Sequence, residues 1–183
     1  FYDDIMKIAK ALPKNMQTLL FSATMPAKIR DLAKKLLRDP ESISLAISKP
    51  AKGITQTAYM CYDSQKVNLV REILKSKGKN LSHVLIFASS IKNVREIKRT
   101  LNKSGMRSSE MHSGLDQNTR EQTIRDFKSK KIRILVATDI LSRGIDIKEI
   151  ELVINYEVPH DAEDYVHRIG RTARAEKTGE AIT

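Results

Sequence analysis

The sequence predicts an α/β fold in which a parallel sheet carries helices on both faces. Four consecutive apolar residues from Val84 to Phe87 have the length and composition of a strand that is buried on both sides. The residues that follow are amphipathic at helical spacing, with apolar side chains at Ile91, Val94, Ile97 and Leu101. The same alternation recurs along the chain, and it is typical of an open, wound α/β sheet.

The expected elements divide the chain in two. Residues 2–11 and 27–37 favour helices, and 17–21 and 42–47 favour strands. Proline, glycine and polar residues at 48–53 predict a linker. Beyond it we expect strands at 55–62, 84–87, 108–111, 132–137, 152–155 and 180–183, with helices around 67–74, 91–101 and 124–127. Residues 1–47 are too few for a domain, and residues 180–183 are the expected opening of a further strand. Both ends of the chain are therefore expected to be cuts in a longer protein.

Composition favours a globular protein in a reducing compartment. Of the 183 residues, 40% are hydrophobic, which is enough for a core. No apolar run reaches the length needed to span a bilayer, and the amino terminus lacks a signal-peptide pattern. The single cysteine, Cys61, can form no internal disulfide and has no cysteine neighbours for a zinc site, so we expect a small apolar strand residue. A cytoplasmic location without membrane contact is expected.

The positive charge is concentrated in one window. The formal net charge is +11, and residues 66–107 hold eleven Lys or Arg against Glu72 and Glu96, a net +9. Contacts of Lys and Arg with phosphate supply most sequence-independent affinity for nucleic acid, so this window predicts a polyanion-binding surface. Aromatic residues make up only 5% of the chain, which favours recognition of the backbone over stacking of bases. The alternative is charge that serves solubility alone.

A first candidate phosphate site is the stretch 167–174, which holds His167, Arg168, Arg171 and Arg174 around Gly170. Guanidinium groups stay charged and bind phosphoryl oxygens two at a time. In a helix, His167, Arg171 and Arg174 would share one face, although a glycine weakens a helix. The alternative is a solvated basic helix face.

A second candidate site follows the apolar strand that ends at Ala137. Ligands of a wound sheet gather outside the carboxyl ends of its strands, where Thr138 and Asp139 stand. Further on, Gly144 allows close approach of the backbone, and the carboxylate of Asp146 can accept a hydrogen bond from a sugar hydroxyl. Helix or turn capping is the alternative for Thr138 and Asp139, and an ordinary turn is the alternative for the glycine.

Together these motifs resemble those of the DEAD-box RNA helicases of superfamily 2. The similarity rests on Ser22-Ala23-Thr24, the strand ending at Phe87, Gln117 with Arg120, Ala137-Thr138-Asp139 through Arg143-Gly144-Ile145-Asp146, and residues 167–174, in the family's order. It covers essentially the whole chain. The resemblance implies a RecA-like sheet of the P-loop NTPase type, with residues 1–47 ending the first RecA-like domain, 48–53 as the linker and 54–183 forming most of the second.

The resemblance also implies a site for ATP with Mg²⁺ in the cleft between the two domains. Arg171 and Arg174 are similar to paired arginine fingers that reach the γ-phosphate, and Asp146, beside Gly144, to the carboxylate that contacts the ribose. Many relatives have glycine at Ala173, so we expect alanine to restrict the turn that precedes Arg174. Neither a phosphate-binding loop nor an Asp-Glu-Ala-Asp motif occurs in the 183 residues. The Mg²⁺ ligands are therefore expected in the rest of the first domain, and this chain alone is expected not to hydrolyse ATP.

Coupling and RNA contacts are implied in the same way. His167 and the hydroxyls of Ser22 and Thr24 would link to the acidic motif of the first domain, and Arg168 would help to order its own motif. Backbone contacts with RNA, which position a strand without reading its sequence, are implied for Ser89, Gly114, Gln117, Arg120 and Thr138. The implied activity is ATP-dependent unwinding of short RNA duplexes. A DNA helicase of the same superfamily and a non-catalytic RNA-binding or partner-docking module are the alternatives.

Overall fold

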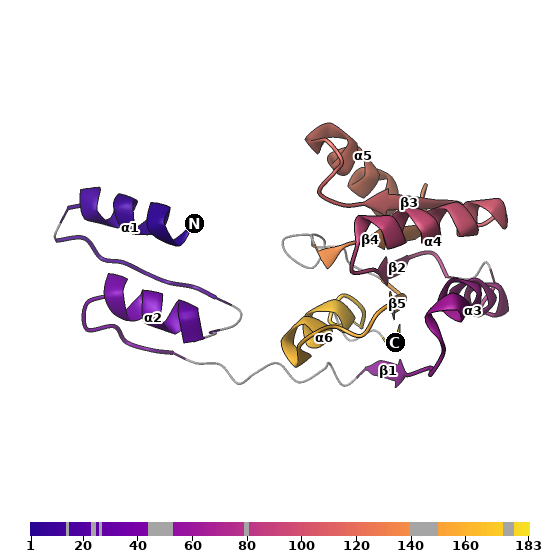
Figure 1. Cartoon of the computed structure of the whole chain (residues 1–183), viewed down its shortest axis with the longest axis horizontal. Coiled ribbons are helices and arrows are strands. Elements are labelled where there is room, and N and C mark those ends of the chain that lie inside the picture. Colours follow the sequence, from indigo (N-terminus) through magenta and orange to yellow (C-terminus); the bar gives the residue numbers. More distant parts are fainter. Residues whose placement is uncertain are drawn as a thin grey trace. The chain divides into compact units, whose positions relative to one another are not determined.

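The chain divides into two compact units, residues 1–47 (unit 1) and 48–183 (unit 2), and each is described by itself (Figure 1). The structure is a computed structural model that describes residues 1–13, 15–22, 25, 27–43, 53–78, 81–139, 150–173 and 178–183. The division falls at the start of the expected linker. The assignment of the two units to a first and a second RecA-like domain stays a prediction.

Unit 2 is built on a parallel sheet, as the apolar runs predicted. Its six strands lie in the order β1-β6-β5-β2-β4-β3, with bounds β1 (Ile54–Thr57), β2 (Val84–Phe87), β3 (Ser108–Met111), β4 (Ile134–Ala137), β5 (Leu152–Asn155) and β6 (Gly179–Ile182). In the register, Phe87 lies opposite both Ala137 and Asn155, and Met111 lies opposite Ala137. The carboxyl ends of the four strands from β5 to β3 are therefore level, so the residues after them share one edge of the sheet.

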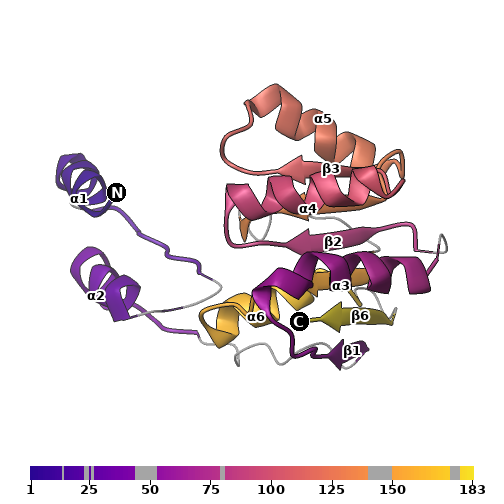
Figure 2. The same cartoon turned by 45° about the vertical axis from the view of Figure 1, so that its right-hand side comes forward.

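Helices cover both faces of this sheet, as predicted. The chain moves in one direction along the sheet through α3 (Asp63–Ser76) and α4 (Ile91–Lys103), and it returns through α5 (Gln117–Lys128) and α6 (Ala162–Ile169). Crossover connections between parallel strands are right-handed, so a helix lies on one face of the sheet when the chain moves one way along it and on the other face when the chain moves back. One core accordingly joins α3 and α4 to Val84 and Ile86, whereas a second joins α5 to Leu85 and Phe87. Figure 2 shows α3 and α4 together on one side of the strands.

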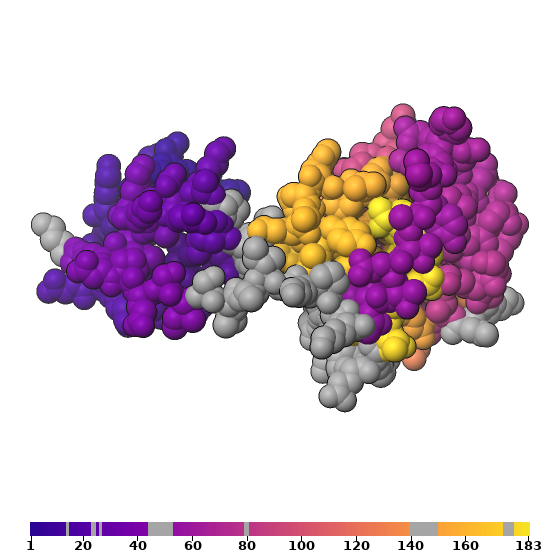
Figure 3. All heavy atoms as spheres, turned by 90° about the horizontal axis from the view of Figure 1, so that it is seen from below, coloured from indigo at the N-terminus to yellow at the C-terminus, as the bar shows by residue number. Residues whose placement is uncertain are grey.

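Strands β1 and β6 bring the beginning and end of unit 2 together. They pair in parallel from Ile54 opposite Gly179, and in Figure 3 the yellow residues of β6 lie beside the magenta residues that begin unit 2. A Cβ atom at Gly179 would stand 2.8 Å from the backbone nitrogen of Ala173. Glycine is required there because the chain passes so close to the segment that follows α6.

Unit 1 contains α1 (Tyr2–Ala11) and α2 (Ala27–Leu36), as predicted. The strand predicted at 17–21 is wrong, since residues 15–22 form neither helix nor strand. A strand needs a neighbour to take up its backbone hydrogen bonds, and the described part of unit 1 contains no strand. Of the strand predicted at 42–47, residues 42 and 43 are irregular and the rest lies outside the described residues.

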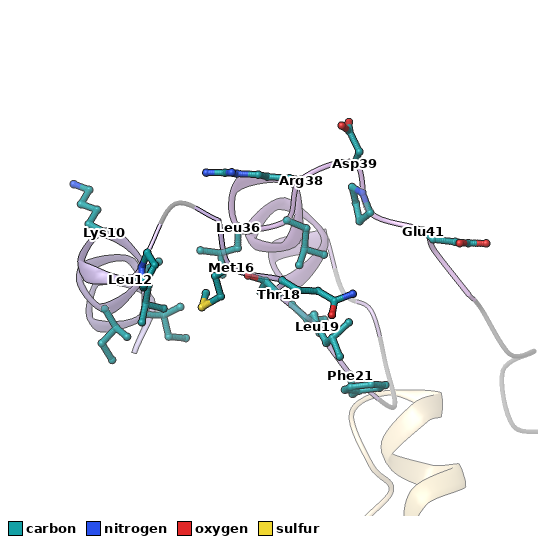
Figure 4. Close-up of a pocket in the computed structure, with 18 of the residues that line it drawn as sticks. Lys10, Leu12, Met16, Thr18, Leu19, Phe21, Leu36, Arg38, Asp39 and Glu41 are labelled. Carbon is teal, nitrogen blue, oxygen red and sulfur yellow. The ribbon is translucent and has the colours of Figure 1, made fainter.

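The helices of unit 1 and the segment between them surround a hollow of about 980 Å³. Figure 4 shows Leu12, Met16 and Leu36 beside it. Phe21, which also lines the hollow, is 89% exposed. Among the described residues of unit 1 only Leu32 is a buried apolar side chain, so this unit forms no core of its own.

Candidate functional site

Three residues expected to contact RNA follow three neighbouring strands at the carboxyl edge of the sheet. Ser89 comes just after β2, Thr138 directly after β4, and Gly114 shortly after β3. The strand ladder continues past the ends, because the amide of Thr138 donates to the carbonyl of Met111 at 3.1 Å. Parallel strands end at a common edge, so residues far apart in the sequence are brought together there. Their contacts with RNA stay a prediction.

The backbone of Gly114 is held by a buried histidine that the sequence did not single out. His112 is fully buried, and its Nδ1 accepts a hydrogen bond of 3.1 Å from the amide of Gly114. A Cβ atom at Gly114 would lie 3.2 Å from that same nitrogen. Because Nδ1 is the acceptor, a neutral ring carries its proton on Nε2. Within the described part of the chain, Nε2 has no hydrogen-bond partner and lies 3.7 Å from a carboxylate oxygen of Glu110. The ring thus fixes the backbone at a proposed RNA contact.

The first turn of α5 adds Gln117 and Arg120 to this edge. Asp116 caps the helix by accepting from the amide of Thr119 at 2.8 Å and from its hydroxyl at 2.6 Å. These hydrogen bonds hold the pKa of Asp116 below its usual value, and the bond from the Thr119 hydroxyl has the larger effect. Gln117 is exposed and donates to Glu121 at 2.9 Å. The Nε atom of Arg120 is buried and has no hydrogen-bond partner among the described residues.

Ser89 is positioned by a carboxylate from a neighbouring strand end. The amide of Ser89 donates to Glu157 at 2.9 Å, and the side chain of Asn93 donates to the other oxygen of the same carboxylate. Ser90 caps α4 by accepting from the amide of Asn93 at 3.1 Å. Glu157 follows β5, so it ties the loop after β2 to the loop after the adjacent strand.

An ion pair between a buried arginine and a half-exposed aspartate links the end of β4 to α6. Arg168 donates from Nε to Oδ1 of Asp139 at 2.7 Å and from Nη2 to Oδ2 at 2.8 Å. The Arg168 side chain is only 5% exposed, whereas that of Asp139 is 48% exposed. The guanidinium also stands 5.3 Å from the centre of the Phe87 ring and donates weakly from Nη1 to the carbonyl of Glu157 at 3.4 Å. This bidentate geometry ties Arg168 to the end of β4, and Phe87 both fills the core and packs against the guanidinium. The ordering role implied for Arg168 stays a prediction.

The end of α6 decides a point that the sequence left open. His167, Arg171 and Arg174 would share one face only if the segment were helical, and α6 ends at Ile169 with Gly170 as its C-cap. The chain then turns, and Thr172 forms an isolated parallel bridge with Ile150. Arg171 therefore stands beyond the helix and donates from Nε to the carbonyl of His167 at 3.3 Å. The bridge between Thr172 and Ile150 draws the chain toward the sheet, so the helix cannot continue.

The structure describes only some of the remaining expected site residues. Thr24, Gly144, Asp146 and Arg174 lie outside the described residues. Ser22 is described and exposed in unit 1. Of the residues expected to contact ATP or to couple to it, those described in unit 2 are thus His167 and Arg171.

The described residues also limit other kinds of site. No group of three or more His, Cys, Asp or Glu side chains among them is placed to hold a metal ion. In the same part of the chain, no helix is both long and apolar enough to cross a membrane. Cys61 is a free, partly buried thiol. The prediction that it lies in a strand is wrong, since β1 ends at Thr57 and residues 58–62 are irregular.

Comparison with known proteins agrees with these observations. The model of the helicase conserved C-terminal domain matches residues 65–176. The ATP-dependent RNA helicase CshA of Listeria monocytogenes is 40% identical over all of this chain and 35% of its own length, and the DEAD-box ATP-dependent RNA helicase RhpA of Helicobacter pylori is 39% identical over all of this chain and 37% of its own. The chain thus spans little more than a third of these relatives.

Solved structures show the same similarity. Dbp5 of S. cerevisiae bound to RNA and ADP BeF3 matches 98% of this chain and 48% of its own, with a TM-score of 0.85 at 30% identity. A DEAD box protein of the hyperthermophile Methanococcus jannaschii matches 98% of this chain and 48% of its own, with a TM-score of 0.67 at 40% identity. The chain therefore belongs to the helicase conserved C-terminal domain family, within the DEAD-box RNA helicases.

Proposed function

We propose that this chain is the part of an ATP-dependent RNA helicase that holds the RNA backbone and supplies the arginine fingers. The observation that carries the proposal is the shared edge where Ser89, Thr138 and Gly114 meet the start of α5. The relatives support it, because those that cover the whole chain are named ATP-dependent RNA helicases. They favour RNA over the DNA helicase alternative. A cytoplasmic location remains part of the proposal.

On the RNA side, this edge offers backbone amides, hydroxyls and the Arg120 guanidinium to phosphate and ribose. Such groups position a strand without reading its bases. The buried Nε of Arg120 has no hydrogen-bond partner in the described structure. It therefore remains a possible donor to RNA in the first turn of α5. A contact with the 2′-hydroxyl would favour RNA over DNA.

On the ATP side, Arg171 and Arg174 would neutralise charge on the phosphoryl group during transfer. In comparable enzymes an arginine at this place raises the rate by about a thousandfold or more. Asp146, beside Gly144, would contact the ribose, while His167, Ser22 and Thr24 would couple nucleotide state to the first domain. ATP with Mg²⁺ would be bound mainly by that domain, which alone would carry the phosphate-binding loop absent from these 183 residues.

The test is ATP turnover by the full-length protein with single-stranded RNA, with DNA of the same sequence, and with neither. Stimulation by RNA alone is expected, and equal stimulation by DNA would point to the DNA helicase alternative. The 183-residue chain alone should show no turnover. Turnover that follows the chain through repeated purification would contradict the proposal.

Variants of the full-length protein separate the remaining alternative. Arg171→Ala should lower kcat by about a thousandfold, whereas Arg125→Ala, an exposed arginine of α5, should leave it unchanged. Thr138→Ala should raise KM for RNA with little effect on KM for ATP. Unchanged turnover in Arg171→Ala and Arg174→Ala would favour a non-catalytic RNA-binding or docking module.

A further inference from the structure

The charge of the basic window is divided unevenly between two helices. In and after α3, carboxylates neutralise the basic side chains, with Lys66 2.8 Å from Asp63 and Lys75 3.2 Å from Glu72. Arg71, Lys77 and Lys98 also have carboxylate partners, and Lys79 lies outside the described residues. The basic residues of the window that form no ion pair within the described structure are Lys92, Arg95, Arg99, Lys103 and Arg107. All of them lie on α4 or in the turn after it.

Four of these side chains form one stripe along α4. Lys92, Arg95, Arg99 and Lys103 recur at spacings of three and four residues, so they share one side of the helix, and all are exposed. The opposite side carries Val94, Ile97 and Leu101, which are fully buried. We call this stripe the α4 ridge. It extends over about 16 Å, because eleven residues of helix rise by about 1.5 Å each.

One carboxylate borders the ridge without neutralising it. Glu96 stands four residues after Lys92 and three before Arg99, yet it forms no ion pair within 4.0 Å in the described structure. Its charge also adds to the effect of burial in raising the pKa of the Tyr156 phenol. One negative charge thus stands against the four positive charges of the ridge. The ridge therefore presents four exposed positive charges along about 16 Å of helix, and a nucleic-acid strand, with one charge per about 3.4 Å of helix rise, places several phosphates within that length.

The ridge is continuous with the proposed RNA edge. Ser89 immediately precedes Ser90, the N-cap of α4, and Lys92 follows in the first turn. The helix then runs from the carboxyl edge of the sheet toward the opposite edge, on the face that it shares with α3 (Figure 2). A strand held at Ser89 that continued over this face would meet Lys92 first and Lys103 last.

We propose that the α4 ridge binds the sugar-phosphate backbone of RNA that extends beyond the segment held at the carboxyl edge. The proposal rests on the proposed function, because the edge itself is assigned there. Exposed Lys and Arg without carboxylate partners release counterions from the polyanion, which provides affinity without sequence preference. The ridge lengthens the RNA footprint and takes no part in the chemistry of ATP.

The test compares two RNAs on the 183-residue chain by fluorescence anisotropy at several salt concentrations. One is about six nucleotides long and fills only the edge, and the other extends the same sequence to about twenty. The ridge variant is Lys92→Gln with Arg95→Gln and Arg99→Gln. The control removes the same charge at the carboxyl end of α5 and just after it, and is Lys128→Gln with Lys130→Gln and Lys131→Gln. Circular dichroism melting of each variant checks that it is folded.

The ridge variant should bind the long RNA about tenfold or more weakly, with the short RNA changed less than twofold. Its plot of log affinity against log salt should become shallower by about 2, since each lost phosphate contact on a single strand removes about 0.7. An equal loss in the control, or an equal loss for both RNAs, would overturn the proposal. If the long RNA is unaffected, the ridge faces another acidic partner and the proposal fails. A wild-type chain that binds neither RNA would overturn the proposed function, and the ridge with it.

Discussion

The ion pair between Arg168 and Asp139 predicts an unequal response to removal of its two partners. Asp139→Asn leaves a guanidinium that is 5% exposed without its carboxylate. A hydrogen bond to a charged group contributes about 1.5–3 kcal/mol, and breaking a fully buried pair from one side costs about 3–5 kcal/mol. Because Asp139 is 48% exposed, solvent screens the pair. We therefore expect a loss of about 2–3 kcal/mol in the free energy of unfolding.

Removal of the buried partner should cost less. Arg168→Met keeps an apolar stem against the Phe87 ring, and the half-exposed carboxylate of Asp139 can turn to water. We expect a loss of about 1 kcal/mol, since only the net contribution of the hydrogen bonds disappears. The double variant should resemble Arg168→Met alone, so the coupling energy from the double-mutant cycle should equal the cost of Asp139→Asn, about 2–3 kcal/mol.

Urea unfolding of the 183-residue chain, followed by far-ultraviolet circular dichroism, measures all three variants. The control is the exposed pair of Arg125 with Glu121, whose nitrogen and oxygen are 3.7 Å apart. Arg125→Met or Glu121→Gln should change stability by less than about 0.5 kcal/mol. If Arg168→Met proves more costly than Asp139→Asn, the argument from burial is wrong.

Three further predictions concern single residues. Ala173 has a φ of 52°, which strains an alanine, so Ala173→Gly should raise the free energy of unfolding in urea by about 0.5–1 kcal/mol. The control Ala162→Gly, in α6, should lower it. If Ala173→Gly lowers the free energy of unfolding, the argument from backbone strain is wrong. Glu157→Gln in the full-length protein weakens the hydrogen bond that holds the amide of Ser89, so KM for RNA should rise about three- to tenfold while KM for ATP stays unchanged. An equal rise in KM for ATP would refute the role of Glu157 in positioning the RNA contact. Burial, followed by neighbouring carboxylates, raises the pKa of Tyr156 to about 12, so the stability from its neutral phenol is complete below about pH 10 and lost as pH rises toward 12; unfolding at about pH 9 and 11.5 should show a larger drop for wild type than for Tyr156→Phe, and equal drops would contradict it.

Local patterns predicted the elements that bury a regular face. The apolar run at Val84–Phe87 and the helical spacing from Ile91 to Leu101 both appear as expected, because each carries its own periodicity. The stretch 17–21 is as apolar as a strand, yet it is irregular. Strand formation depends on a neighbouring strand, and a pattern within one segment cannot supply that information.

The candidate site could be predicted where a motif residue follows the end of a strand. Thr138, Gly114 and Ser89 lie at one edge because parallel strands end together. Knowing which strand each residue follows was therefore enough to predict that they lie at the same edge. The partners that hold them were not predictable. His112 and Glu157 carry no distinctive spacing, and they act through contacts with other segments of the chain.

By itself, the sequence determined the fold class, the helicase motifs and the excess of basic residues at 66–107. Only the tertiary structure decided which of those charges are neutralised and where α6 ends. Ion pairs such as Lys77 with Glu180 join residues from distant segments, and the bridge of Thr172 to Ile150 draws the chain away from the helix. Both depend on how the strands are ordered in the sheet, and that order is a property of the whole fold.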